Sequence, residues 1–197
     1  MAELYEMLKG LSDIPIALIS FVFGLLLWKK RKEWSLLFLL IAVSAVLGAV
    51  VHTFDFPRAW NRVIWIVLYI FLYELIRRFA HLMVCYVSGK AERERTPVYI
   101  LEAVLYAVTL VFMFCVDIND IYVFVVFAAV MLVRVACASV RFRPVPFKAG
   151  LLMAVLIFPL ALQALEAVIP YAVLIEHIIL AASLCIAFVM AREEPRA

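Results

Sequence analysis

Long apolar runs alternate with short polar breaks along the chain, and seven such runs can be counted. Most are about twenty residues long, the length an α-helix needs to cross the hydrocarbon core of a bilayer. A transmembrane barrel would instead need alternating strands of about ten residues. We therefore predict an all-α fold, a single integral membrane bundle of seven transmembrane helices over residues 1–197. The predicted helices cover residues 11–28, 34–53, 62–87, 97–116, 121–140, 147–168 and, after Pro170, up to residue 191.

The start of the first helix has recognisable signals. Pro15 would fall near its first turn, where a missing N–H is tolerated, and Ser12 or Asp13 could cap it. The residues before this helix are mixed and acidic, without a small-residue cleavage site, so we expect the helix itself to direct insertion.

Composition strengthens the membrane prediction. The chain is 69% hydrophobic and 17% charged, with a mean hydropathy of +1.12, whereas soluble domains are roughly 45–50% apolar. Lipid must therefore cover much of its surface. The four cysteines lie singly in different apolar runs and are interpreted as small buried residues. We expect a multi-pass protein of the cell membrane of a prokaryote. We expect no nucleic-acid partners.

The basic residues predict the orientation, because cytoplasmic loops carry an excess of Lys and Arg. The loops after the first, third and fifth helices and the tail are rich in them, and the other loops are poor. We therefore expect the amino terminus outside and the carboxyl terminus inside. The basic set comprises Lys29, Lys30, Arg31, Lys32, Lys90, Arg93, Arg95, Arg141, Arg143, Lys148, Arg192 and Arg196.

Polar residues within or beside the apolar runs collect at the predicted outer end of the bundle. Such groups are costly in lipid and tend to face a bundle interior or a water-filled cavity, so we predict a polar pocket that opens to the extracytoplasmic side. Asp13, Asp117 and Asp120 have a second interpretation, as helix-end acids that cap a helix or meet water. The outer set comprises Asp13, His52, Asp55, Asp117, Asn119, Asp120, Glu166, Glu176 and His177.

The two outer histidines, His52 and His177, are candidate metal ligands. Each lies inside an apolar run, and they either face each other across the pocket or are separate hydrogen-bonded core histidines. Imidazoles with carboxylates typically bind zinc or another divalent transition metal. Asp13 and Glu176 are the carboxylates assigned to such a site, although Glu176 and His177 are about 100° apart around their helix. No local spacing signature accompanies these residues.

The second predicted helix carries a stripe of small residues that ends in a histidine. Ser44, Gly48 and His52 recur every four residues and share one face, flanked by Ala45 and Ala49. Small residues allow a neighbouring helix to approach closely, which accounts for Ser44 and Gly48 but not for the histidine.

A second set of charges lies toward the predicted inner end. Glu74 is spaced i, i+3 and i, i+4 from Arg77 and Arg78, and Glu102 and Arg134 are natural partners at similar depth. Paired, snorkelling side chains explain this set. An anionic headgroup site or a charge relay is the functional alternative.

Several of these residues resemble small prokaryotic members of the CREST superfamily, the group of alkaline ceramidases and progestin and adipoQ receptors. The resemblance rests on Asp13 near the start of the first helix, on Trp34 and Phe38 at the start of the second, and on the run LGAVVHTF. It implies a seven-helix fold and a zinc-dependent amide hydrolase, with His52 and His177 as metal ligands. The family serine position is Gly48 here, and a second histidine on the last helix is missing.

Three functions follow from these observations. The first is a membrane-embedded hydrolase of a lipid amide or ester, in which a metal activates water and Asp55 or Glu166 acts as general base. The second is a non-catalytic receptor or sensor that binds a small apolar or lipid ligand, with Ser44, Asn119 and Asp120 in the binding pocket. The third is a small-solute or proton-coupled transporter. A retinal protein is excluded because the last helix has no lysine.

Overall fold

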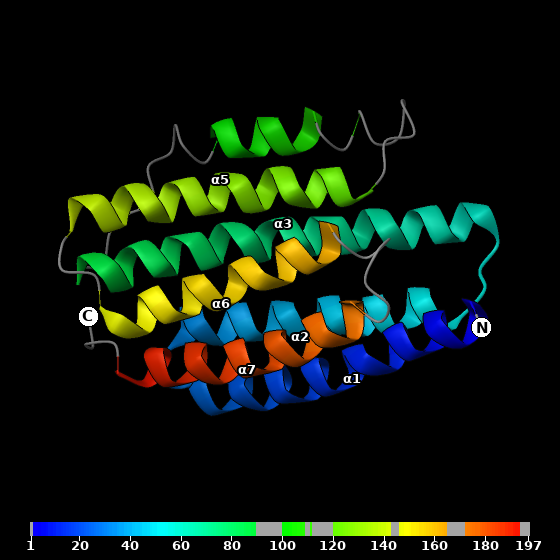
Figure 1. Cartoon of the computed structure of the whole chain (residues 1–197), viewed down its shortest axis with the longest axis horizontal. Coiled ribbons are helices and arrows are strands. Elements are labelled where there is room, and N and C mark those ends of the chain that lie inside the picture. Colours follow the sequence, from blue (N-terminus) through cyan, green and yellow to red (C-terminus); the bar gives the residue numbers. More distant parts are fainter. Residues whose placement is uncertain are drawn as a thin grey trace.

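All regular secondary structure in the described part of the chain is helical. The computed structural model describes residues 2–89, 100–108, 111, 120–142, 146–164 and 172–193, and these contain no strand. The helices lie lengthwise side by side, with the start of α1 and the end of α7 at opposite ends of the bundle (Figure 1). The labelled helices are α1 (Ala2–Leu27), α2 (Lys32–Thr53), α3 (Arg58–Ser88), α5 (Asp120–Arg141), α6 (Phe147–Ala164) and α7 (Ala172–Glu193), and residues 100–108 are also helical.

Helix ends lie close to the predicted polar breaks. α2 ends where Phe54 becomes extended, and Pro57 directly precedes α3. α3 ends at Gly89, whose φ of 65° is the left-handed conformation that glycine adopts without a steric penalty.

The start of α1 differs from the prediction. The helix begins at Ala2 and not near residue 11, because residues 2–9 are mostly good helix formers. Pro15 therefore lies inside α1, and the predicted capping role of Ser12 or Asp13 is wrong. Both side chains lie within the helix and can point at neighbouring helices.

Within the described residues, three helical stretches are long and apolar enough to cross a membrane, by length and composition: Met7–Leu27, Lys32–Thr53 and Ala172–Glu193. α1 has the inverse of a water-soluble pattern, because Leu18 and Leu26 are each 61% exposed while Asp13 and Ser20 are buried. Large apolar side chains outside and small or polar ones inside suit a helix in lipid. The coarser prediction of helices that could span a membrane is therefore confirmed for these three.

α1, α2 and α7 pack together with a regular register. α2 runs antiparallel to α1, so that Asp13 meets Gly48 and Phe23 meets Phe38. α7 runs parallel to α1, so that Ser12 meets His177 and Phe23 stacks on Phe188. The predicted small-residue stripe of α2 thus lies against α1. A residue later in α1 therefore lies level with a residue equally many positions earlier in α2 and equally many positions later in α7.

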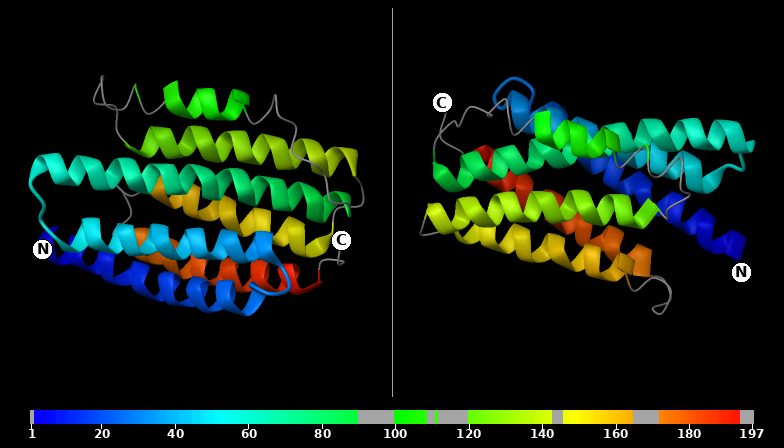
Figure 2. Two further views of the ribbon diagram at one scale, coloured as in Figure 1. Left: turned by 180° about the vertical axis from the view of Figure 1, so that it is seen from behind. Right: turned by 90° about the horizontal axis from the view of Figure 1, so that it is seen from above.

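The remaining helices complete the bundle. α3 packs against α2 on one side and against α5 on the other, and α6 lies along α7. Figure 2 shows the same arrangement from behind and from above, with the segment 100–108 over α3 and α5, where Tyr106 stacks on Tyr73 of α3. Buried apolar side chains from these helices form one core, which includes Phe38, Met83, Leu152 and Met190.

Candidate functional site

A carboxylate from α1 reaches the backbone of α2 at the candidate site. Asp13 is 9% exposed, and a Cβ added at Gly48 would lie 2.7 Å from its Oδ2 atom. Glycine at position 48 therefore leaves the space that the Asp13 carboxylate occupies. The interpretation of Asp13 as a helix-end acid that meets water is wrong, because α1 continues past it in both directions and α2 covers it.

The imidazole of His177 on α7 contacts the same turn of α1. Its Nδ1 lies 2.5 Å from Ser12 Oγ, and its Nε2 lies 3.5 Å from Asp13 Oδ1. Ser12 Oγ also lies 2.7 Å from the carbonyl oxygen of Lys9, to which its hydroxyl can donate. Two consecutive residues of α1 therefore face the two nitrogens of one histidine ring, which is the contact pattern of a hydroxyl, a base and an acid.

The other predicted histidine, His52, lies beside this contact. Its ring packs edge to face against that of Trp65, with the two ring centroids 6.1 Å apart, and Trp65 stacks on Tyr69. His52 and Lys9 are both close enough to His177 to interact with it electrostatically. The structure thus places His52 near His177, which itself contacts Asp13.

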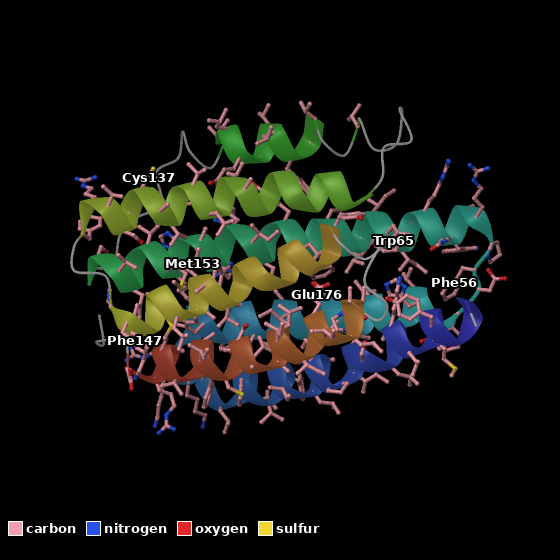
Figure 3. The ribbon with its side chains drawn as sticks, viewed as in Figure 1. Phe56, Trp65, Cys137, Phe147, Met153 and Glu176 are labelled. Atoms are coloured by element: carbon pink, nitrogen blue, oxygen red, sulfur yellow. The ribbon has the colours of Figure 1, made fainter. Side chains whose placement is uncertain are left out.

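Glu176 is 5% exposed. Figure 3 shows it near the start of α7, nearer than Phe147 to the end of the bundle where the loop residue Phe56 lies. Ser44 is buried on α2 one turn from Gly48. Asp55 is exposed in the loop between α2 and α3.

Four residues of the predicted outer set have no described side chain. Asn119 and Glu166 lie outside the described residues, as does Asp117. Asp120 is the first residue of α5, and its side chain is not described.

The described residues do not by themselves assemble a zinc site. Within residues 2–89, 100–108, 120–142, 146–164 and 172–193, no group of three or more His, Cys, Asp or Glu could hold a metal ion. Both ring nitrogens of His177 also face groups of α1.

The sequence suggested Ser12 only as a helix cap and gave no indication of its contact with His177. The available signal was its position next to Asp13, near the start of a long apolar run. That signal is weak, because the partner of Ser12 lies 165 residues away on α7.

The inner charges form two groups of ion pairs, as predicted. Arg77 and Arg78 bind Glu74 at 2.7 and 2.9 Å, and Arg78 also pairs with Glu33 at the start of α2. Arg134 on α5 binds Glu102 at 3.0 Å. A small cavity lies between the two groups, lined by Tyr73, Ile76, Arg77, Ala80, Glu102, Leu105 and Val130.

These features define a helical bundle with span-capable helices and a partly buried Ser–His–Asp contact between α1 and α7. A family model described as "Family of unknown function (DUF6962)" matches residues 8–195, and the chain belongs to that family. No curated protein and no solved structure matches the chain.

Proposed function

We propose that the protein is a multi-pass membrane protein with seven crossings, its amino terminus outside and its carboxyl terminus inside. The three span-capable helices support the membrane location. The orientation is supported because the basic turn after α1, the end of α5, the start of α6 and the end of α7 gather at one end of the bundle (Figure 1). An ion pair between Lys148 of α6 and Glu193 of α7 joins two of these ends.

Single cysteines in a cysteine-free background test this orientation. Arg58→Cys, at the start of α3, should react in intact cells with a reagent that cannot cross the membrane. Lys30→Cys, in the turn after α1, should react only after the membrane is permeabilised. The reverse result would contradict the proposed orientation.

We propose that the cluster of Ser12, Asp13 and His177 hydrolyses an ester or amide bond of a membrane lipid. The observation that carries the proposal is the 2.5 Å contact between Ser12 Oγ and His177 Nδ1, with Asp13 beside the other ring nitrogen. A nucleophile within hydrogen-bond reach of a base, itself oriented by a third group, is the arrangement that activates a hydroxyl.

The reaction would follow from these contacts. His177 takes the proton of the Ser12 hydroxyl at Nδ1 while Oγ attacks the carbonyl carbon of the lipid. The proton then passes to the departing amine or alkoxide, which leaves an acyl group on Ser12. His177 next takes a proton from water while the water oxygen attacks the acyl carbon. The bond between that carbon and Ser12 Oγ then breaks, His177 returns the proton to Oγ, and the fatty acid is released. In both steps, the Asp13 carboxylate stabilises the protonated imidazole of His177 through the Nε2–H of that ring.

The depth of the cluster favours a lipid as substrate. Ser12 lies five residues inside the span that begins at Met7, which corresponds to about 7 Å of helix rise. This depth is close to the boundary between headgroups and acyl chains. The exposed surface of α1 around it is apolar, with Leu11 and Ile14 on the outer face, so a lipid can reach the site from the bilayer.

The resemblance to the CREST superfamily remains part of the proposal. Three residues on which the resemblance depends lie on α1, α2 and α7: Asp13 contacts His177, and His52 lies near His177. This convergence supports a hydrolytic site at that position. The serine mechanism differs from the zinc mechanism that the resemblance implies, and metal analysis distinguishes the two.

The proposal is tested by incubating the purified protein with a panel of ester and amide lipids and with a fluorophosphonate that labels activated serines. We expect hydrolysis and labelling to fall by about a thousandfold in Ser12→Ala and in His177→Ala. Ser183→Ala is the matched control, because the Ser183 hydroxyl donates to the carbonyl of Ile179 in its own helix. Hydrolysis that survives in Ser12→Ala would contradict the serine mechanism. Absence of both hydrolysis and labelling in the folded native protein would contradict the enzyme and leave a ligand-binding or transport role.

A further inference from the structure

The face of α1 that carries Ser12 also carries a basic residue. Tyr5, Lys9 and Ser12 are spaced i, i+4 and i+7, so they lie within about 60° of one another around the helix. Ser12 Oγ lies 2.7 Å from the carbonyl oxygen of Lys9, which is the residue one turn before it. This face therefore places a cation one turn outward of the proposed nucleophile.

The ammonium group of Lys9 points still further outward. It lies 4.6 Å from the centroid of the Tyr5 ring, one turn nearer to the amino-terminal end of α1. Lys9 and Tyr5 precede Ser12 by three and seven residues, so the ammonium lies about 4.5–10.5 Å of helix rise outward of Ser12. Long basic side chains near the ends of membrane helices extend toward the headgroups in this way.

Tyr5 and Lys9 lie at the outer boundary of the proposed span. The span-capable stretch of α1 begins at Met7, between these two residues, and tyrosine is enriched at the level of lipid headgroups. The headgroup region of one leaflet is about 5–8 Å thick. The Lys9 ammonium therefore lies within this region when Ser12 lies at its inner boundary.

Lys9 belongs to the same site as the histidine. It is close enough to His177 to interact with it electrostatically, and Ser12 contacts the ring of His177. The carboxylate of Asp13 lies on the other side of Ser12, four residues and about 6 Å of rise inward of Lys9, where α2 covers it at Gly48. A ligand that extends outward from Ser12 therefore moves toward the positive charge of Lys9 and away from the negative charge of Asp13.

A glycerophospholipid has the matching arrangement of groups. Its ester carbonyls lie at the boundary between headgroups and acyl chains, and its phosphate lies further out, in the headgroup region. Lysine binds phosphate as a compact positive charge. The ammonium has three N–H donors, so it can bind a phosphate oxygen while it stays over the Tyr5 ring. A diacylglycerol or a ceramide has the carbonyl but no phosphate, and would make no ion pair with Lys9.

We infer that Lys9 selects glycerophospholipids of the outer leaflet as substrates, because it binds their phosphate while an ester carbonyl lies at Ser12. The inference rests on the proposed function, since Ser12 attacks the selected lipid. One phospholipid and one water then give one fatty acid and one lysophospholipid. Lys9 contacts no reacting atom, so its role is substrate specificity.

The test compares the hydrolysis of three lipids with identical acyl chains in the same mixed micelles: phosphatidylglycerol, phosphatidylethanolamine and diacylglycerol. The native protein should hydrolyse both phospholipids with a kcat/KM at least about tenfold higher than that for diacylglycerol. Phosphatidylethanolamine carries a phosphate without net charge. It therefore separates recognition of the phosphate from attraction to a negatively charged micelle.

Variants of Lys9 show whether this residue causes the preference. Lys9→Gln should lower the ratio of the phospholipid kcat/KM to the diacylglycerol kcat/KM by about tenfold, and Lys9→Arg should retain most of it. Arg58→Gln is the matched control, because it removes an exposed basic side chain at the start of α3, at the same outer end. A native ratio near one, an equal fall in Arg58→Gln, or a fall of both rates without a change in their ratio would overturn the inference.

A binding measurement distinguishes this inference from the proposed hydrolysis. Ser12→Ala lacks the nucleophile, so lipid binding can be measured in it without turnover. Dihexanoyl phosphatidylglycerol should raise the Tm of Ser12→Ala more than dihexanoylglycerol does, and adding Lys9→Gln should remove this difference. If the native protein hydrolyses none of the three lipids but the difference is observed, hydrolysis fails and recognition of the phosphate by Lys9 stands. Absence of the difference would overturn the inference even if the native protein hydrolyses lipids.

Discussion

Substitution of Gly48 by alanine tests the contact on which the candidate site depends. The added Cβ would lie 2.7 Å from Oδ2 and 3.4 Å from Cγ of Asp13. Ordinary contact begins near 3.4 Å, so the carboxylate would have to move by about 0.7 Å. Such overpacking typically lowers the free energy of unfolding by about 1–3 kcal/mol. The higher helix propensity of alanine offsets roughly 0.5–1 kcal/mol of this loss. We therefore expect a net loss of about 1–2 kcal/mol.

The assay is thermal or denaturant unfolding of the purified protein in detergent. For a chain of this length, the loss corresponds to a decrease in Tm of about 3–6 °C. Gly150→Ala is the matched control, because nothing lies within 4 Å of a Cβ added there. That variant should be unchanged or more stable by roughly 0.5–1 kcal/mol.

A double-mutant cycle shows whether Asp13 is the cause. In an Asp13→Ala background the added methyl group has no carboxylate to displace, so Gly48→Ala should become neutral or stabilising. The coupling between the two substitutions should be about 1–2 kcal/mol. The same loss of stability in both backgrounds would refute the contact between Asp13 and Gly48.

Three further predictions concern packing, charge and metal. Gly10→Ala should lower the free energy of unfolding by about 2–3 kcal/mol, more than Gly48→Ala does. The added Cβ would lie 2.9 Å from the carbonyl oxygen of Ala49, a backbone atom that cannot rotate away. A smaller loss would argue against the close contact of α1 with α2 at this position. Arg134→Met should lower the free energy of unfolding by about 2–4 kcal/mol, because it removes the ion-pair partner of Glu102. Adding Glu102→Gln to this variant should recover most of the lost stability. A double variant as unstable as Arg134→Met alone would contradict the pairing. The zinc content measured by elemental mass spectrometry should stay well below one ion per chain even after zinc is added. About one zinc ion per chain that is lost in His177→Ala would instead support the metal-hydrolase hypothesis.

Local pattern was sufficient to predict most of the helical architecture. Apolar runs with polar breaks predicted α2, α5 and α7 to within a few residues, because helix ends follow the change from apolar to polar sequence. Charge complementarity at suitable spacing also predicted the pairs of Glu74 with Arg78 and of Glu102 with Arg134. The prediction failed at the start of α1, where good helix formers outside the apolar run extend the helix.

The sequence by itself determined that the chain forms long apolar helices and that a stripe of small residues ends at His52. Only the tertiary structure decided that Asp13 is buried against Gly48 and that Ser12 and Asp13 face the two nitrogens of His177. These contacts depend on the register of α1 against α2 and α7. A one-residue change of register rotates a side chain by about 100° and moves it about 1.5 Å, and the packing that sets this register joins residues distant in the sequence.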